Sequence, residues 1–271
     1  MSKQVAEAKD NLPSTDVMSM FEEHEGEGLD YDTSELQIPF IRIAQATSDQ
    51  VKKKSPKYIE GLSVGDIYNT VTGKYYDGEK GVILIPCYQE TVNLKFIPRS
   101  EGGGFLGILS PDDPEISKAK RTGSLELLPD GNELIRSDQH YCLVIGEDGV
   151  PNFGIVDMKK TSLTMSRKWK SMLSMLTIEI KGVMKRPPIF LTKWKLSVVE
   201  DKNDKGDWCN HLITSAGYLI DPDGKSSEED KELANMALNF RKSVVSGEAK
   251  AVAEDVVTEI ESEEPEQHSA F

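Results

Sequence analysis

The chain has 271 residues, of which 38% are hydrophobic, and a formal net charge of −14. That length suits one large domain or two small ones, with a modest core if the ends are disordered. The sequence has no apolar run of about 18 residues and no apolar stretch near its start, which argues against a membrane span and a signal peptide. Its three widely spaced cysteines fit a reducing cytoplasm.

The negative charge is concentrated at the two ends of the chain. Residues 1–35 contain ten acids and two lysines, and residues 248–271 contain eight acids and one lysine. Segments this charged bury too little apolar surface to offset the entropy lost on ordering, so both are predicted to be disordered arms. The intervening body, residues 36–247, carries a net charge of only +1. The acidic pI therefore describes the arms, and the body is where a fold is expected.

The body is predicted to be mainly β. Runs rich in Ile, Val, Tyr and Thr alternate with Gly-Asp and Asp-Gly turns, which is typical of antiparallel strands. We expect strands near residues 65–72, 74–77, 81–97, 124–128, 133–136, 140–149, 150–158, 189–200 and 207–220. The segment 100–115, with three consecutive glycines before Phe105, is predicted to be a flexible loop with an exposed aromatic.

Two helices are predicted beside the strands. In 162–178, apolar residues recur at helical spacing from Met165 through Trp169 to Leu176. In 227–244, Ser227 begins a capping box and Gly247 follows the last turn. The predicted fold class is therefore mainly β with appended helices, an antiparallel barrel or sandwich.

Basic residues are concentrated in one segment of the body. Residues 159–195 contain ten Lys or Arg and a single acid, Glu179. Such a segment in an acidic protein suggests a surface for phosphates, although exposed lysines on a helix often serve only solubility. The basic candidates for phosphate contact here are Lys159, Lys160, Arg167, Lys168, Lys170, Lys185, Arg186, Lys193 and Lys195. Lys193 and Lys195 are expected to share one strand face, with Trp194 on the other.

A second basic cluster lies in the predicted loop 51–61. It contains Lys52, Lys53, Lys54 and Lys57, followed by Tyr58. Bases stack on aromatic side chains whatever their sequence, so Tyr58 and Phe105 are candidate stacking platforms, although any aromatic is more often part of a core.

Metal and enzyme signatures are weak or missing. His140 and Cys142, and Cys209 and His211, would form a tetrahedral zinc site only if their strands were neighbours, and buried cysteine is the commoner explanation. No phosphate-binding Gly-rich loop with its lysine, no HExxH and no GxSxG is present. We therefore predict no metal, no cofactor and no enzymatic activity.

The acidic C-terminal tail ends in Phe271, behind a β-rich body with basic and aromatic residues. This arrangement resembles single-stranded DNA-binding proteins of the bacterial and T7-like phage type. The resemblance implies an OB fold and a tail that binds replication proteins (polymerase, helicase or primase), here through Glu263, Glu264, Glu266 and Phe271. The residues next to Phe271 are not acidic, unlike those of the known tails. Separately, the pattern IPFIRIAQATS…SPKYIEGLSVGDIYNTVTGKYY…GVILIPCY is similar to phage proteins encoded near replication genes.

The leading hypothesis is a phage protein of the host cytoplasm that binds single-stranded DNA in replication or recombination. Its acidic tail is expected to compete with DNA for the basic segment. The alternative is a protein-binding adaptor or inhibitor whose acidic arms mimic nucleic acid. The sequence does not determine the oligomeric state, and a homodimer is possible. It also does not determine whether the protein prefers single or double strands, or DNA or RNA.

Overall fold

A computed structural model describes Ser19 and residues 37–123, 125–203, 206–220, 226–249 and 251. The predicted disordered arms, 1–35 and 248–271, lie outside these residues except for Ser19, Glu248, Ala249 and Ala251, and so do Glu263, Glu264, Glu266 and Phe271. No helix in the described ranges is long and apolar enough to cross a membrane.

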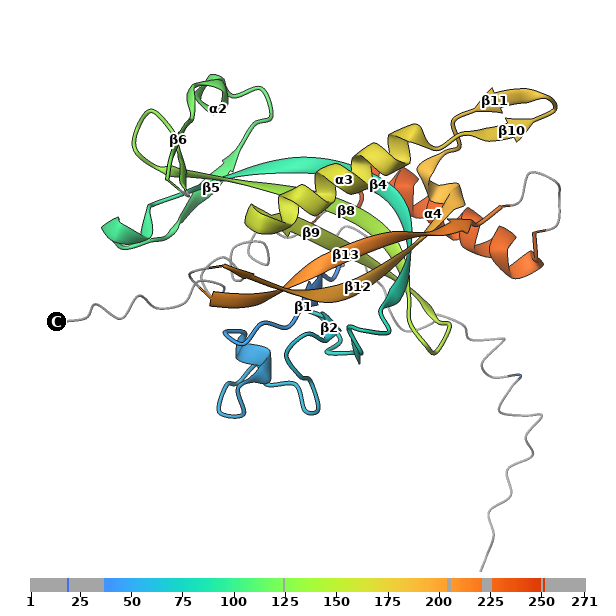
Figure 1. The fold of residues 1–271 in the computed structure, drawn as a ribbon, viewed down its shortest axis with the longest axis horizontal. Coiled ribbons are helices and arrows are strands. Elements are labelled where there is room, and N and C mark those ends of the chain that lie inside the picture. Colours follow the sequence, from blue (N-terminus) through green and yellow to red (C-terminus); the bar gives the residue numbers. More distant parts are fainter. Residues whose placement is uncertain are drawn as a thin grey trace, which may run out of the picture. The chain divides into compact units, whose positions relative to one another are not determined.

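One large antiparallel sheet dominates the described part of the chain (Figure 1). In hydrogen-bonded order it contains β13 (Gly206–Tyr218), β12 (Thr192–Asn203), β4 (Val82–Phe96), β8 (Glu133–Ile145), β7 (Leu125–Leu127) and β6 (Lys120–Thr122). In addition, β5 (Phe105–Leu109) pairs with β4, and β9 (Pro151–Lys159) pairs with β8. The long strands β12, β4, β8 and β9 thus lie in the spatial order fourth, first, second, third along the chain, which is a Greek key.

Smaller elements surround this sheet. They are β1 (Ile41–Ile43), β2 (Ile67–Asn69) and β3 (Tyr75–Tyr76) in one sheet, and β10 (Ile178–Ile180) and β11 (Val183–Lys185) in another. The α-helices are α2 (Pro114–Lys118), α3 (Leu163–Met175) and α4 (Glu228–Ser246), and the 3₁₀ turns are η2 (Asp49–Val51), η3 (Arg99–Glu101), η4 (Lys160–Ser162) and η5 (Ile189–Leu191).

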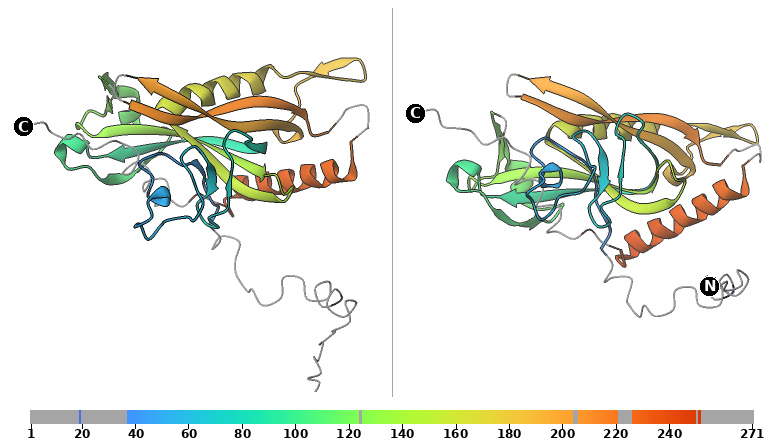
Figure 2. Two further views of the ribbon diagram at one scale, coloured as in Figure 1. Left: turned by 60° about the horizontal axis from the view of Figure 1, so that its bottom comes forward. Right: turned by 90° about the horizontal axis from the view of Figure 1, so that it is seen from below.

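The sheet has an apolar cluster on each face because successive side chains point to opposite sides. In β8, Tyr141 and Leu143 join one cluster with Phe240 of α4. Cys142 and Val144 join the other cluster, which contains Trp169 of α3. Consequently α3 and α4 cover opposite faces, and the sheet lies between them in both views of Figure 2.

The two predicted helices are confirmed, with changed ends. Helix α4 begins after Ser227, whose hydroxyl accepts the Asp230 N–H, and ends at Gly247 with φ of 81°. Helix α3 stops at Met175, earlier than predicted, and the chain continues extended from Leu176. The β-branched residues Thr177 and Ile178 that follow suit the strand β10 better than a further helical turn.

The prediction of mainly antiparallel β structure is confirmed, but the described strands form no closed barrel. Other groups occupy the two edges that would have to meet. The edge of β9 is occupied by the segment around Pro39, because the Ile155 N–H donates to Pro39 O at 2.9 Å. On β13, the Gln45 side chain bonds both the N–H and the carbonyl of Cys209, at 2.9 and 2.8 Å. Residues 39–45 therefore stand where direct pairing of β9 with β13 would close the sheet.

The segment predicted to be a flexible loop with an exposed Phe105 is partly a strand. Phe105 lies in β5, half-buried against Phe96 with ring centroids 5.3 Å apart. Pairing of β5 with β4 supplies the order that the glycine-rich composition did not predict.

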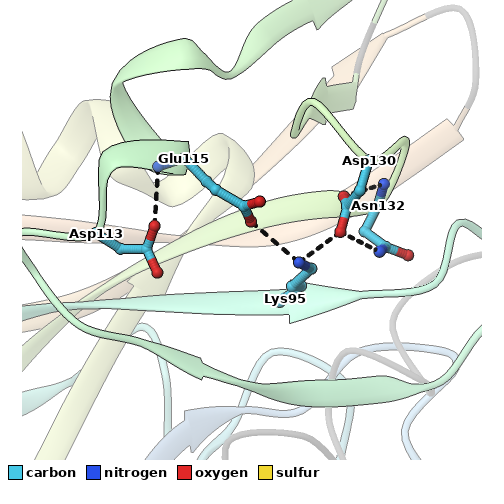
Figure 3. A network of polar contacts seen from close by, with 5 residues as sticks. All are labelled: Lys95, Asp113, Glu115, Asp130 and Asn132. Carbon is cyan, nitrogen blue, oxygen red and sulfur yellow. Dashed lines mark hydrogen bonds and ion pairs between the residues drawn. The ribbon is translucent and has the colours of Figure 1, made fainter.

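A polar network attaches the α2 segment to the large sheet (Figure 3). Lys95 Nζ of β4 lies 3.1 Å from Glu115 Oε2 and 2.5 Å from Asp130 Oδ2, while Asp113 caps α2 by accepting the Glu115 N–H. Hydrogen bonds from Lys95 and then from Asn132 lower the pKa of Asp130 to about 2. Lys95 thus links helix α2 to the turn that contains Asp130.

Candidate nucleic-acid interface

Helix α3 carries the centre of the predicted basic segment. Met165, Trp169 and Leu173 are buried at intervals of four residues and fix the helix on the sheet. Trp169 is fully buried and packs edge-to-face on Trp194, with ring centroids 6.0 Å apart. Arg167 and Lys168 fall on the opposite, exposed side. The same periodicity that buries the tryptophan therefore presents the two cations to solvent.

A buried polar network also holds α3 in place. Asp138 of β8 accepts hydrogen bonds from Ser166 at 2.6 Å, Lys170 at 2.6 Å and Thr91 at 2.7 Å. Burial would raise the pKa of Asp138, but these three donors outweigh it and the pKa is lowered. Asp138 is therefore an anion, and Lys170 is its counter-ion rather than a free phosphate ligand.

His140 completes this network as a neutral imidazole. Burial lowers its pKa to about 3. Its Nε2 lies 2.9 Å from Ser166 Oγ, and because that hydroxyl donates to Asp138, the Nε2–H must donate to Ser166. Ser166 is completely buried and bonded to the carboxylate, so it has neither the access nor the base that a nucleophilic serine needs. The network positions a helix.

The basic residues continue from α3 into the hairpin formed by β10 and β11. This hairpin projects beyond the C-terminal end of α3 in Figures 1 and 2. Its cations Lys181, Lys185 and Arg186 are exposed. Together with Arg167 and Lys168 they form what we call the basic strip. Within the described ranges, no ion pair or side-chain hydrogen bond engages any of these five cations.

The other predicted phosphate ligands lie elsewhere. Lys159 is buried and ion-paired with Asp157 at 3.1 Å, so its expected place on the surface is corrected. Lys193 and Lys195 do lie opposite the buried Trp194, as predicted, but Lys193 pairs with Asp230 of α4 at 3.3 Å. That face of β12 is the α4 side, so these two lysines are not part of the basic strip. Lys160 is exposed in η4, just before α3.

Strands of the large sheet lie between α3 and the loop with Lys52, Lys53, Lys54 and Lys57 (Figure 1, and Figure 2, left). Lys52 pairs with Asp49 at 3.0 Å, and the other three lysines are exposed. Tyr58 is half-buried beside them. The two basic clusters predicted from sequence are therefore on different sides of the molecule.

The histidine and cysteine pairs do not lie on neighbouring strands. His140 and Cys142 lie on β8, while Cys209 and His211 lie on β13, with β4 and β12 between those strands. In the described part of the chain, no three His, Cys, Asp or Glu side chains are grouped as metal ligands would be.

Sequence reasoning missed the hairpin itself. Two short runs with β-branched residues, IEI and VMK, flank Lys181 and Gly182, which both have positive φ, 52° and 77°. Positive φ at both residues is typical of a two-residue type I′ turn. The signal in the sequence was the gap of two residues between two strand-like runs.

Comparisons with known proteins agree with a phage origin. Searches of curated proteins and of solved structures find no significant match. One family model, described as "Pam3 phage gp34-like protein", matches residues 7–250, which is most of the chain and includes the whole sheet, α3, the hairpin and α4. The chain belongs to the Pam3 phage gp34-like protein family.

Proposed function

We propose that this phage protein binds single-stranded DNA in replication or recombination, with the basic strip as its main phosphate-binding surface. The proposal rests on the exposure of those five cations and on their lack of ion pairs with the described residues. Glu179 is the one acid in residues 159–195. Some other lysines of the described body, such as Lys95 and Lys193, are paired with carboxylates, and the exposed Lys53, Lys54 and Lys57 lie apart from the strip. Unpaired cations retain the charge that a phosphate backbone needs.

The connectivity supports an OB-like fold as the scaffold. An OB fold is a five-stranded, partly open Greek-key barrel. Here β4, β8, β9 and β12 form a Greek key, β13 is the fifth strand, and α3 lies between the third and fourth. On this view the barrel is left open by residues 39–45.

The proposed binding surface differs from the usual OB surface. OB folds bind oligonucleotides on the face of their second and third strands. In this chain the corresponding face of β8 and β9 is covered by α4, whose Phe240 packs on Phe153 at 4.4 Å and on Tyr141 at 6.3 Å between ring centroids. We therefore assign the phosphate contacts to α3 and the hairpin.

The direct test is binding of wild-type protein to fluorescein-labelled oligo(dT), followed by anisotropy at several salt concentrations. Five phosphate contacts predict that log K falls against log[salt] with a slope of about −3.5. A duplex of the same length and an oligo(U) strand establish which nucleic acid is preferred. Absence of binding at about 50 mM salt would rule out the proposal and favour the adaptor with acidic arms.

The acidic C-terminal tail is proposed to compete for the basic strip. Ala249 and Ala251 pack on the apolar cluster under α4, so a truncation after Ala251 leaves these contacts intact. We expect the truncated protein to bind oligo(dT) more tightly than wild type, with the largest gain at low salt, where attraction between tail and strip is least screened. A full-length variant in which Asn and Gln replace the Asp and Glu residues of the tail should bind oligo(dT) as tightly as the truncated protein. Equal affinities for all three proteins would exclude the competition.

A further inference from the structure

The β10–β11 hairpin exposes apolar side chains as well as cations. Val183 is 55% exposed and Met184 61%, and Ile180 is also exposed. The register pairs Ile180 with Val183 across the hairpin, so these two share a face, while Met184 lies on the other face opposite Glu179. Both faces of the projecting end therefore present an apolar side chain to solvent.

These three exposed apolar side chains are grouped in one short hairpin. The two strands form a sheet of their own, joined to no other strand among the described residues. A lone two-stranded hairpin is only marginally stable in water, and grouped exposed apolar side chains commonly mark a binding surface. The type I′ turn at Lys181 and Gly182 keeps the strands in register without support from a core.

The charges around these side chains indicate what binds there. Lys181 is in the turn, Lys185 ends β11 and Arg186 follows it, against the single acid Glu179. A second copy of the same hairpin would bring like charges together, which disfavours self-association. An anionic membrane fits the charge, but the hairpin contains no Trp, Phe or Leu, the residues that usually anchor interfacial segments. A nucleic acid fits both the cations and the mixed surface.

We propose that the hairpin is a wedge that packs Ile180, Val183 and Met184 against unstacked bases of the bound strand. Lys181, Lys185 and Arg186 hold the phosphates on either side. Apolar side chains of this kind insert between base steps in other nucleic-acid complexes, where they exchange base stacking for protein contact. The inference rests on the proposed binding of single-stranded DNA, and adds that the contact reaches the bases.

The test separates apolar from electrostatic contact. The variant I180T/V183T/M184T keeps strand-forming residues in an exposed hairpin, so the fold should survive. The matched control V64T/V71T/V150T changes three apolar residues with similar exposure in other loops. We expect the hairpin variant to bind oligo(dT) about tenfold more weakly than the control with an unchanged salt slope, because only apolar burial is lost. An oligonucleotide containing 2-aminopurine should brighten on binding wild type and the control, but not the hairpin variant.

Each alternative gives a different result. If wild type binds and the hairpin variant matches it in affinity and in 2-aminopurine signal, the wedge is wrong and the proposed function stands. If wild type does not bind oligo(dT), both proposals fail. If the variant loses binding only to vesicles of phosphatidylcholine and phosphatidylglycerol, the surface is a membrane contact and the wedge is overturned.

Discussion

Replacing all five cations of the basic strip with glutamine should weaken oligo(dT) binding by about a thousandfold or more at about 50 mM salt. The variant is R167Q/K168Q/K181Q/K185Q/R186Q. Each lost phosphate contact removes the release of one condensed counterion, so the salt slope should flatten by about 0.7 per contact. All five side chains are exposed and pair with no residue that the structure describes, so the free energy of unfolding should change little.

The control removes the same charges from other exposed positions. It is K118Q/K120Q/R121Q/R241Q/K242Q, which also replaces three lysines and two arginines. Long-range attraction should weaken equally in both variants, so the difference between them measures direct contact. Equal losses of affinity would show that net charge alone drives binding and that the strip is not the site.

The variant W169A should lose about 3–5 kcal/mol of stability, as expected for truncating a fully buried tryptophan. The indole packs on Trp194 and on His140, so its removal leaves a cavity between α3 and the sheet. Urea denaturation followed by circular dichroism measures this loss. Because α3 presents Arg167 and Lys168, DNA binding should weaken under conditions in which the helix detaches.

Two comparison variants identify the cause of this loss. Among the described residues the Trp169 Nε1–H has no hydrogen-bond partner, so W169F keeps most of the apolar volume without breaking a bond and should cost less than about 2 kcal/mol. M175A changes a residue of the same helix that is 70% exposed and should stay within about 0.5 kcal/mol of wild type. A W169A protein as stable as M175A would contradict the packing of α3 described above.

Local features of the fold were predictable from sequence because their causes are local. The β8–β9 hairpin follows from apolar strands around an Asp-Gly turn, and α4 from its Ser227 cap and the glycine at its end. The stripe with Trp169 correctly predicted which side of α3 is buried. In each case the decisive residues are within a few positions of one another.

The candidate site was predictable only in part. That Arg167 and Lys168 are exposed follows from helical periodicity, but the burial of Lys159 depends on what covers β9. The aspartate two residues before Lys159 was the available signal, since residues i and i+2 share a strand face. The partner of Lys193 lies 37 residues later in the chain, on a helix whose position no local pattern reveals.

The sequence by itself determined the acidic ends, the mainly β body, the two helices and the concentration of cations in residues 159–195. Charge, propensity and periodicity are properties of neighbouring residues, so no fold is needed to see them. Only the tertiary structure decided which of the described cations are unpaired, that the 52–57 loop lies across the sheet from α3, and that residues 39–45 lie between the edges of β9 and β13. Those outcomes depend on which distant segments pack together, because a charge is available to a ligand only where the fold brings no opposite charge to it.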